Sequence, residues 1–294
     1  MTTSQLYNPR TGYWEKEIFG RLSNNIHIQT GLDAVPVVAG ASHDTAAAVA
    51  AVPASDGNFA FISSGTWSLV GIESEKPIIN KKSLEYSIAN QGGVCRNFMV
   101  LKNITGFWLL QECQREWSKT REYSADDLAK MAENTGFPGT VIDPDHPDFL
   151  APESMPEAIY RFCRNTDQPV PSDIGQYVRV ILESLALTYR HTLERLEGMG
   201  GNKIERIHIV GGGSQNKLLN QLAADTSGLP VYIGPIEATS IGNILVQALA
   251  MGRLASLGEL REIVRNSFEV VKYEPEPAPC WDRAYQKLVE IRKG

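Results

Sequence analysis

Strand-like and helix-like segments alternate from Val35 to the last residues of this chain, and this alternation limits its possible folds more than any other feature. Strand-like runs of apolar and β-branched residues occupy 35–40, 58–65, 66–73, 94–102, 205–212 and 229–234. Segments with helical spacing occupy 103–117, 124–136, 172–200, 214–228, 239–252 and 281–293. Hairpins mixed with crossover helices predict an α/β fold, with a mixed sheet flanked by helices.

Local signals make two of the helical assignments specific. Ser124 is a good N-cap, Asp127 stands at the capping-box position, and Gly136 follows as a stop signal. The segment 172–200 carries its apolar residues on one stripe: Ile174, Val178, Ile181, Leu185, Tyr189, Leu193 and Leu196. The sequence therefore predicts one capped helix and one long amphipathic helix.

The composition argues against several functions. The 294 residues include 28 Lys and Arg against 34 Asp and Glu, a formal net charge of −6, and no basic block interleaves with aromatic residues. A nucleic-acid surface is therefore not expected. The cysteines are too widely spaced for a metal-binding pair, which predicts reduced thiols and no protein metal site: Cys95, Cys113, Cys163 and Cys280. No apolar run reaches about 18 residues, so we expect a cytoplasmic protein that does not contact a membrane.

The stretch ASHDTAAAV, residues 41–49, joins a strand signal to an alanine-rich helix signal. Asp44 would stand where a strand ends and a helix begins, which is where ligands bind in open α/β sheets. The residue alone allows two interpretations, a helix cap or a carboxylate that accepts a proton from a substrate hydroxyl. His43 and Thr45 add polar groups that a cap does not need. The small residues that follow would let this helix lie close to another element.

The stretch FISSGTWS, residues 61–68, predicts a tight hairpin turn between two strands. It also suits a phosphate clasp, because small residues let backbone amides approach an anion. Ser64 and Thr66 would add hydroxyl donors. Both interpretations stay open from this motif alone.

The stretch IHIVGGGSQN, residues 207–216, runs from a strand through three glycines into a helix expected from about Ser214. Gly211 and Gly213 match two positions of a dinucleotide fingerprint, but Asn216 takes the third and no acidic residue ends the next strand. A Rossmann NAD site is therefore disfavoured. The glycines predict close approach of a flat or phosphorylated ligand to Gly211 and Gly212, or simply a tight turn.

The stretch LKNITGFWLLQE, residues 101–112, contains the start of a helical pattern. A helix beginning near Asn103 would place Asn103, Phe107 and Gln111 on one side over roughly 12 Å. The two amides would then contact different ends of one elongated site. The alternative gives Asn103 a cap role and leaves Gln111 in solvent. A further stretch, residues 143–149 (DPDHPDF), lacks the pattern of a calcium loop and is expected to be solvated.

Taken together and in this order, these four motifs resemble the FGGY family of carbohydrate kinases, and within it the kinases that act on L-rhamnulose. The resemblance covers residues 2–22 and 32–294. It implies an actin-like, ribonuclease-H-like ATPase fold with two domains that close over a cleft. It also implies transfer of the γ-phosphoryl group of ATP, with Mg²⁺, to the 1-hydroxyl of L-rhamnulose, giving L-rhamnulose 1-phosphate and ADP.

The resemblance also assigns roles to residues. It makes Asp44 the catalytic base and a sugar contact, and it adds three further sugar contacts: His43, Thr45 and Asn103. Thr66 matches a contact to the ATP phosphates. The remaining ATP contacts that it implies are Gln111, Gly211, Gly212 and Asn216.

The kinases of this family are much longer, and their N-terminal domain supplies further phosphate and sugar contacts. We therefore expect residues 1–31 to be the remnant of such a domain with a shortened linker, and residues 32–294 to be the C-terminal nucleotide-binding domain. The expected partners are a small ketose and the missing N-terminal domain. Two alternatives stay open, a nucleotide-binding fragment without catalysis and a kinase for another ketose such as fuculose or xylulose.

Overall fold

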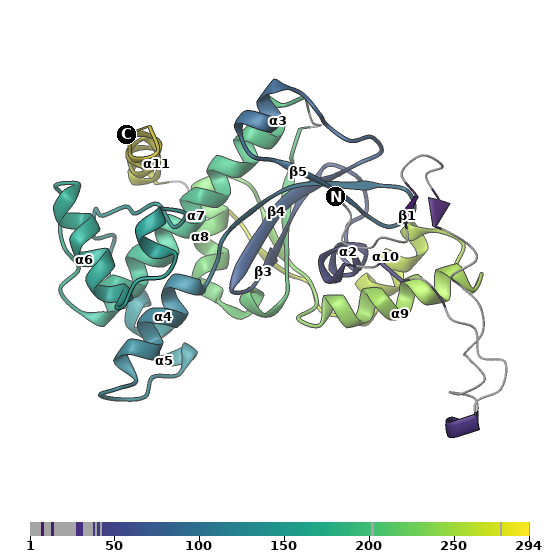
Figure 1. Cartoon of the computed structure of the whole chain (residues 1–294), viewed down its shortest axis with the longest axis horizontal. Coiled ribbons are helices and arrows are strands. Elements are labelled where there is room, and N and C mark those ends of the chain that lie inside the picture. Colours follow the sequence, from purple (N-terminus) through teal and green to yellow (C-terminus); the bar gives the residue numbers. More distant parts are fainter. Residues whose placement is uncertain are drawn as a thin grey trace.

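The centre of the structure is a seven-stranded mixed sheet, seen in a computed structural model (Figure 1). The structure describes residues 7–8, 13–14, 28–31, 38, 40–41, 43–200, 203–276 and 278–293. The strands lie in the order β5-β6-β4-β3-β7-β8-β9. Their bounds are β3 Phe59–Ser64, β4 Trp67–Ser74, β5 Ala89–Gly92, β6 Phe98–Thr105, β7 Arg206–Val210, β8 Val231–Ile233 and β9 Val271–Tyr273. A separate pair, β1 (Tyr7–Asn8) and β2 (Tyr13–Trp14), is antiparallel.

Strand direction follows from the connections. β3 and β4 form the antiparallel hairpin expected from the sequence, and β4 pairs antiparallel with β6. β3 pairs parallel with β7, which the chain reaches from β6 through α4–α7. β7 pairs parallel with β8, and the helix α8 makes the crossover between them. The ends of β3 and β7 therefore meet at one edge of the sheet.

Helices cover both faces of the sheet, as the α/β pattern requires (Figure 1). Their bounds are α2 Asp44–Ala50, α3 Lys81–Glu85, α4 Trp108–Trp117, α5 Ala125–Glu133, α6 Met155–Asn165, α7 Ile174–Gly198, α8 Lys217–Ser227, α9 Ala238–Ala250, α10 Leu257–Ser267 and α11 Pro279–Ile291. The larger core joins one sheet face to α4–α8, and the smaller core joins the other face to α2, α9 and α10. This division follows from alternation along the strands, since Ala60 and Ile62 face the first core while Phe59 and Phe61 face the second.

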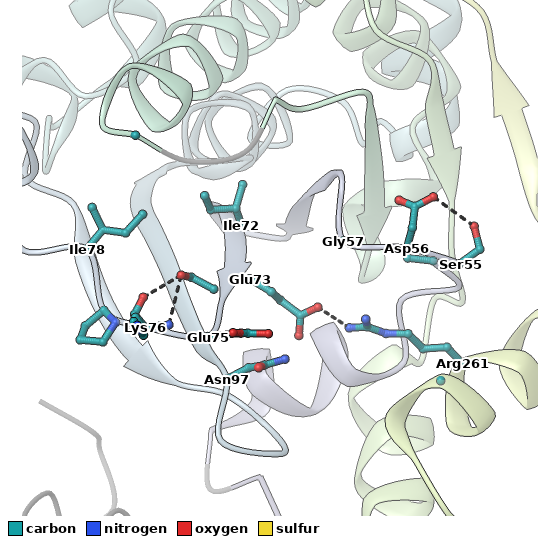
Figure 2. A pocket seen from close by; sticks show the side chains of 15 residues that line it. Ser55, Asp56, Gly57, Ile72, Glu73, Glu75, Lys76, Ile78, Asn97 and Arg261 are labelled. Atoms are coloured by element: carbon teal, nitrogen blue, oxygen red, sulfur yellow. Dashed lines mark hydrogen bonds and ion pairs between the residues drawn. The ribbon is translucent and has the colours of Figure 1, made fainter.

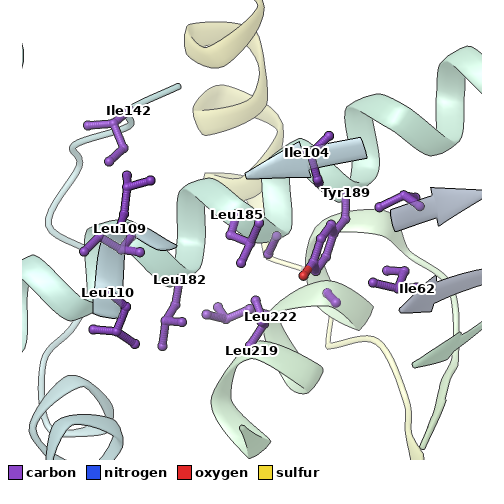
Figure 3. Packing of buried hydrophobic residues seen from close by; sticks show 14 of the residues in the cluster. Ile62, Ile104, Leu109, Leu110, Ile142, Leu182, Leu185, Tyr189, Leu219 and Leu222 are labelled. Carbon is purple, nitrogen blue, oxygen red and sulfur yellow. The ribbon is translucent and has the colours of Figure 1, made fainter. Parts of the chain in front are cut away.

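The long helix α7 organises the larger core. Figure 3 shows its apolar stripe beside α8 and the sheet, with these residues labelled: Leu182, Leu185, Tyr189, Leu219, Leu222, Ile62 and Ile104. Tyr189 is fully buried, and its hydroxyl lies 2.9 Å from Ser68 Oγ on β4. This hydrogen bond satisfies two polar groups that would otherwise be costly to bury.

The structure confirms the capping box of Ser124 with Asp127, but α5 ends at Glu133, before the expected stop at Gly136. It also confirms the apolar stripe of α7, which is buried from Val178 to Leu196. The sequence patterns did not predict α3, α6, α10, β5 or β9. The strand expected at 35–40 lies mostly outside the described residues, as does the domain boundary expected after residue 31.

The helix predicted from Asn103 is wrong in its start. Asn103 lies within β6 and pairs with Leu69 of β4, and the helix α4 begins only at Trp108. Backbone pairing with β4 continues through Thr105, so the strand overrides the helical spacing of the side chains. Asn103 and Gln111 therefore do not share a helix face.

Candidate functional site

Two loops that the sequence singled out lie side by side at the edge where β3 and β7 end. Ser63 pairs with Val210, so the hairpin turn after β3 and the glycine turn after β7 leave the sheet next to each other. Gly211 has a φ of 87°, which favours glycine. A Cβ atom on Gly213 would lie 2.2 Å from Ser64 Oγ, so only glycine lets the two loops approach this closely.

Donor groups on these two loops suit an anion. The side chain of Thr66 is exposed, and its backbone amide makes no hydrogen bond to another described residue. Gly212 is exposed and has open space around its Cα. Within the described chain, the buried hydroxyl groups of Ser64 and Ser214 lack hydrogen-bond partners. The amide and hydroxyl of Thr66, beside the open backbone of Gly212, form a donor set that suits phosphate oxygens.

The turn after β6 holds the hairpin from behind. The amides of Gly106 and Trp108 donate to the Thr66 carbonyl at 3.1 and 3.2 Å, and the amide of Phe107 donates to the Gly65 carbonyl at 3.0 Å. A Cβ atom on Gly106 would lie 2.5 Å from the Gly65 carbonyl oxygen. These three bonds satisfy the carbonyls of Gly65 and Thr66. The donor groups of the hairpin therefore remain available on its outward side.

The side chain of Asp44 stands exposed at the start of α2. The helix is capped by His43, whose Nδ1 accepts from the Thr45 amide at 3.1 Å. Asp44 Oδ1 accepts from the same amide at 2.7 Å and lies 2.8 Å from His43 Nδ1. Its side chain is 75% exposed, so the carboxylate is accessible to a ligand. Thr45 is only 4% exposed, and its hydroxyl lies 3.4 Å from Asp44 Oδ1.

Helix α9 packs beside Asp44, a contact that the sequence patterns did not predict. The Thr239 hydroxyl lies 3.5 Å from the Asp44 carbonyl oxygen. A Cβ atom on Gly242 would lie 1.8 Å from the Ala47 carbonyl oxygen, so the two helices touch backbone to backbone. The prediction that the alanine-rich helix lies close to another element is confirmed. The signal for its partner was present in Gly242, a glycine inside a helical pattern.

The remaining predicted residues fall in three environments. Asn103 is exposed, and alternation along β6 puts it on the face that packs against α2, the face of Met99 and Leu101. Gln111 is exposed in the first turn of α4. Asn216 caps α8, with its Oδ1 accepting from the Leu219 amide at 2.8 Å.

The fold therefore brings Thr66, Gly211 and Gly212 together directly through paired strands. Gln111 lies in the first turn of α4, the helix that follows the turn at 106–108. Its backbone amide donates to the Phe107 carbonyl. Asp44 and Asn103 share the other sheet face.

A polar hollow of about 720 Å³ lies at the opposite end of the sheet (Figure 2). Asp56 lies before β3 and Glu73 near the end of β4, and both line it. Glu73 pairs with Arg261 of α10 at 2.6 Å, and Arg261 also donates to the Val49 carbonyl at 3.1 Å. Since none of the predicted site residues lines the hollow, we assign this ion pair to joining β4, α10 and α2.

Across the described ranges, no group of three or more His, Cys, Asp or Glu side chains is arranged to hold a metal ion. In the same part of the chain, no helix combines the length and apolar character needed to cross a membrane.

Comparison with known proteins gives one family match. The profile described as "FGGY family of carbohydrate kinases, C-terminal domain" matches residues 60–251. The rhamnulokinase of Bacteroides thetaiotaomicron is 44% identical over 269 residues, which are 92% of this chain and 55% of that protein. The rhamnulokinase of Mannheimia succiniciproducens is 38% identical over 288 residues, covering 94% of this chain and 59% of that protein. The chain thus spans little more than half the length of these relatives.

Solved structures share the fold. A xylulose kinase from Rhodospirillum rubrum superposes with a TM-score of 0.70 at 19% identity, over 93% of this chain and 55% of that one. A gluconate kinase from Lactobacillus acidophilus gives a TM-score of 0.70 at 15% identity, over 98% and 62% respectively. The expected actin-like ATPase fold, with a mixed sheet flanked by helices, is confirmed.

Proposed function

Because the chain belongs to the FGGY family of carbohydrate kinases, we propose that it supplies the nucleotide-binding half of an enzyme that transfers a phosphoryl group from ATP to a sugar. The observation that carries this proposal is the contact between the hairpin of Thr66 and the turn of Gly211 and Gly212. Each loop offers exposed backbone and small residues where a phosphate chain can approach. In this proposal the nucleotide-binding domain spans residues 32–294, and residues 1–31 belong to a preceding domain.

For the sugar, we propose L-rhamnulose, phosphorylated on its 1-hydroxyl to give L-rhamnulose 1-phosphate and ADP. Support comes from two relatives named rhamnulokinase, at 44% and 38% identity over more than nine-tenths of this chain. His43 and Asn103 would contribute hydrogen bonds to the ketose, because both lie on the side of the sheet that holds Asp44.

Asp44 would act as the general base. Its carboxylate would accept the proton of the sugar hydroxyl as that oxygen attacks the γ-phosphorus. The bond between the γ-phosphorus and the β,γ-bridging oxygen would break, and ADP would leave with the electron pair. Thr45 is buried, so its role in this scheme is to hold the Asp44 carboxylate through its amide and hydroxyl. Base catalysis of this kind contributes typically about 10²–10⁴-fold to the rate.

The nucleotide side of the reaction would depend on positioning and charge. Thr66 would donate its amide and hydroxyl to the phosphates, with Gly211 and Gly212 giving close backbone approach. Gln111 and the free side-chain amide of Asn216 would complete the nucleotide contacts. When bound with ATP, Mg²⁺ would neutralise phosphate charge. It would be held mainly by phosphate oxygens and water, since no acidic cluster is available among the described residues.

A ketose panel with coupled detection of ADP tests this proposal. L-Rhamnulose, L-fuculose and D-xylulose would each be offered with Mg-ATP, and calorimetry would measure ATP binding by the same protein. We expect ATP binding and the highest kcat/KM with L-rhamnulose. A preference for fuculose or xylulose would keep the kinase and replace the sugar. ATP binding without phosphorylation of any sugar would favour a nucleotide-binding module without catalysis, and absence of ATP binding would refute the proposal.

A further inference from the structure

Among the residues that the structure describes, the last residues of β6 have no strand neighbour on one side. β5 pairs with β6 only from Phe98 to Leu101, so the outer edge of β6 is open from Lys102 onward. The Thr105 amide is nevertheless satisfied, because it donates to Asp145 Oδ1 at 2.8 Å. Asp145 comes from the loop 143–149, which the sequence analysis expected to be solvated. Its carboxylate takes the place that a strand carbonyl would occupy.

An arginine whose side chain is largely covered contacts this loop in turn. Arg292, the C-cap residue of α11, lies 2.5 Å from Asp143 Oδ1 and 3.5 Å from Asp145 Oδ2. The same nitrogen lies 3.3 Å from the Thr188 hydroxyl of α7. The side chains of Arg292 and Asp143 are 11% and 14% exposed, so the contact between them is largely shielded from water. The Asp145 side chain is 28% exposed, so its contact with Arg292 is partly open to water. The backbone amide of Asp145 also donates to Asp143 Oδ1 at 3.1 Å, and this bond orients the Asp143 side chain.

The bonded amide of Thr105 is adjacent to the turn that supports the hairpin. Residues 106–108 donate three amides to the carbonyls of Gly65 and Thr66. The Phe107 ring also reaches the second loop, since a Cβ atom on Gly213 would lie 2.7 Å from Phe107 Cε2. One short segment therefore contacts both loops of the proposed phosphate site.

We propose that Asp145 is a positioning residue for the nucleotide site, anchored by Arg292 and acting through the turn at 105–108. The effect on nucleotide binding rests on the proposed function. The coupling between Asp145 and the hairpin can be measured without a nucleotide. Losing the carboxylate releases the Thr105 amide, which loosens the turn and spreads the orientations of the Thr66 donors. A looser donor set binds phosphates more weakly because ordering it then costs binding energy.

ADP binding by the 294-residue chain, measured by calorimetry, gives the first test. We expect Asp145→Ala to weaken ADP binding about tenfold, while Asp145→Asn, which keeps an oxygen acceptor for the Thr105 amide, stays within about threefold. The matched control is Asp148→Ala, because Asp148 lies in the same loop, is largely exposed and contacts only His146. Equal affinity of the Asp145→Ala and Asp148→Ala proteins would overturn the proposal.

Hydrogen–deuterium exchange without nucleotide gives the second test. In Asp145→Ala, the amides of residues 105–108 should exchange at least about tenfold faster, while α10 keeps its protection and reports an intact fold. Unchanged exchange at 105–108 would refute the coupling even if ADP binds. If the wild-type chain fails to bind ADP and exchange still rises at 105–108, the proposed function fails and the coupling stands.

Discussion

Two adjacent residues at the start of α2 have different surroundings. His43 provides the helix cap, and Asp44 keeps a carboxylate that is largely exposed. The sequence left a cap and a proton acceptor as alternatives for Asp44, and a cap from His43 makes the second compatible with a well-formed helix.

Replacing Asp44 tests its proposed role as the base. In the active enzyme, Asp44→Asn should lower kcat by about 10³-fold, because an amide cannot take the proton, while ATP binding changes less than about twofold. Asp126→Asn is the matched control, since Asp126 is an exposed aspartate in the first turn of α5. Steady-state kinetics and calorimetry would measure both effects. Wild-type kcat in Asp44→Asn would remove Asp44 from the mechanism.

His208 makes the stability of the fold sensitive to acid. It is 3% exposed on β7, between the rings of Phe59 and Tyr232, and neither ring nitrogen has a partner in the described structure. Burial, as the main cause, lowers the pKa of His208 to about 3. The unfolded chain therefore binds a proton on His208 near pH 6.5, whereas the folded chain does not bind it until about pH 3. The free energy of unfolding thus falls as the pH drops from about 6.5 towards 3.

The variant His208→Phe should remove this sensitivity. Between pH 7 and pH 4.5 the wild type should lose about 2–3 kcal/mol more free energy of unfolding than the variant. Urea unfolding at the two pH values measures the difference, and the acid response of the other histidines cancels in the comparison. Parallel pH dependence of the two proteins would show that His208 takes up its proton equally in the folded and unfolded chain.

At the scale of elements, the contact between α2 and α9 explains the alanine run. Residues 46–51 are all buried, and Gly242 of α9 meets the Ala47 carbonyl with no space for a side chain. Small residues on both helices allow backbone contact, which fixes the start of α2 relative to α9. The exposed position of Asp44 thus depends on the small residues that follow it in α2 and on Gly242 of α9.

Gly242→Ala should separate these helices. The added methyl group cannot fit without a backbone shift, so we expect a loss of about 1–3 kcal/mol in the free energy of unfolding. Gly258→Ala on α10 is the control, because a Cβ there meets only Ser256 Oγ at 3.5 Å. Urea unfolding compares the two proteins. Equal stability of both variants would mean that the helices can move apart at little cost.

At the scale of the molecule, one end of the sheet carries the two loops proposed to bind phosphate, and the other end carries the ion pair of Glu73 and Arg261. The two helical layers are tied to this sheet by buried polar contacts, such as Tyr189 with Ser68 on one face and Arg261 with the Val49 carbonyl on the other. Related kinases extend well beyond the region matched here.

We expect the 294-residue chain to bind ATP but to phosphorylate L-rhamnulose at least about 100-fold more slowly than a form of the length of its relatives. A cleft with one side leaves the phosphates in water, which weakens every electrostatic contact to them. Coupled detection of ADP on both forms measures the ratio. Similar rates would show that residues 1–294 already form the whole catalytic site.

The sequence by itself determined the class of fold, the hairpin at Gly65, the turn at Gly211 and the capping box of α5, because each depends on neighbouring residues. The tertiary structure alone decided that Asn103 lies in a strand, since its partner Leu69 is far along the chain. It also decided that the carboxylate of Asp145, although partly exposed, bonds the Thr105 amide and Arg292, because these partners come from 40 and 147 residues away. Local patterns record backbone preference and periodicity, whereas pairing and burial depend on what distant segments bring to the same place.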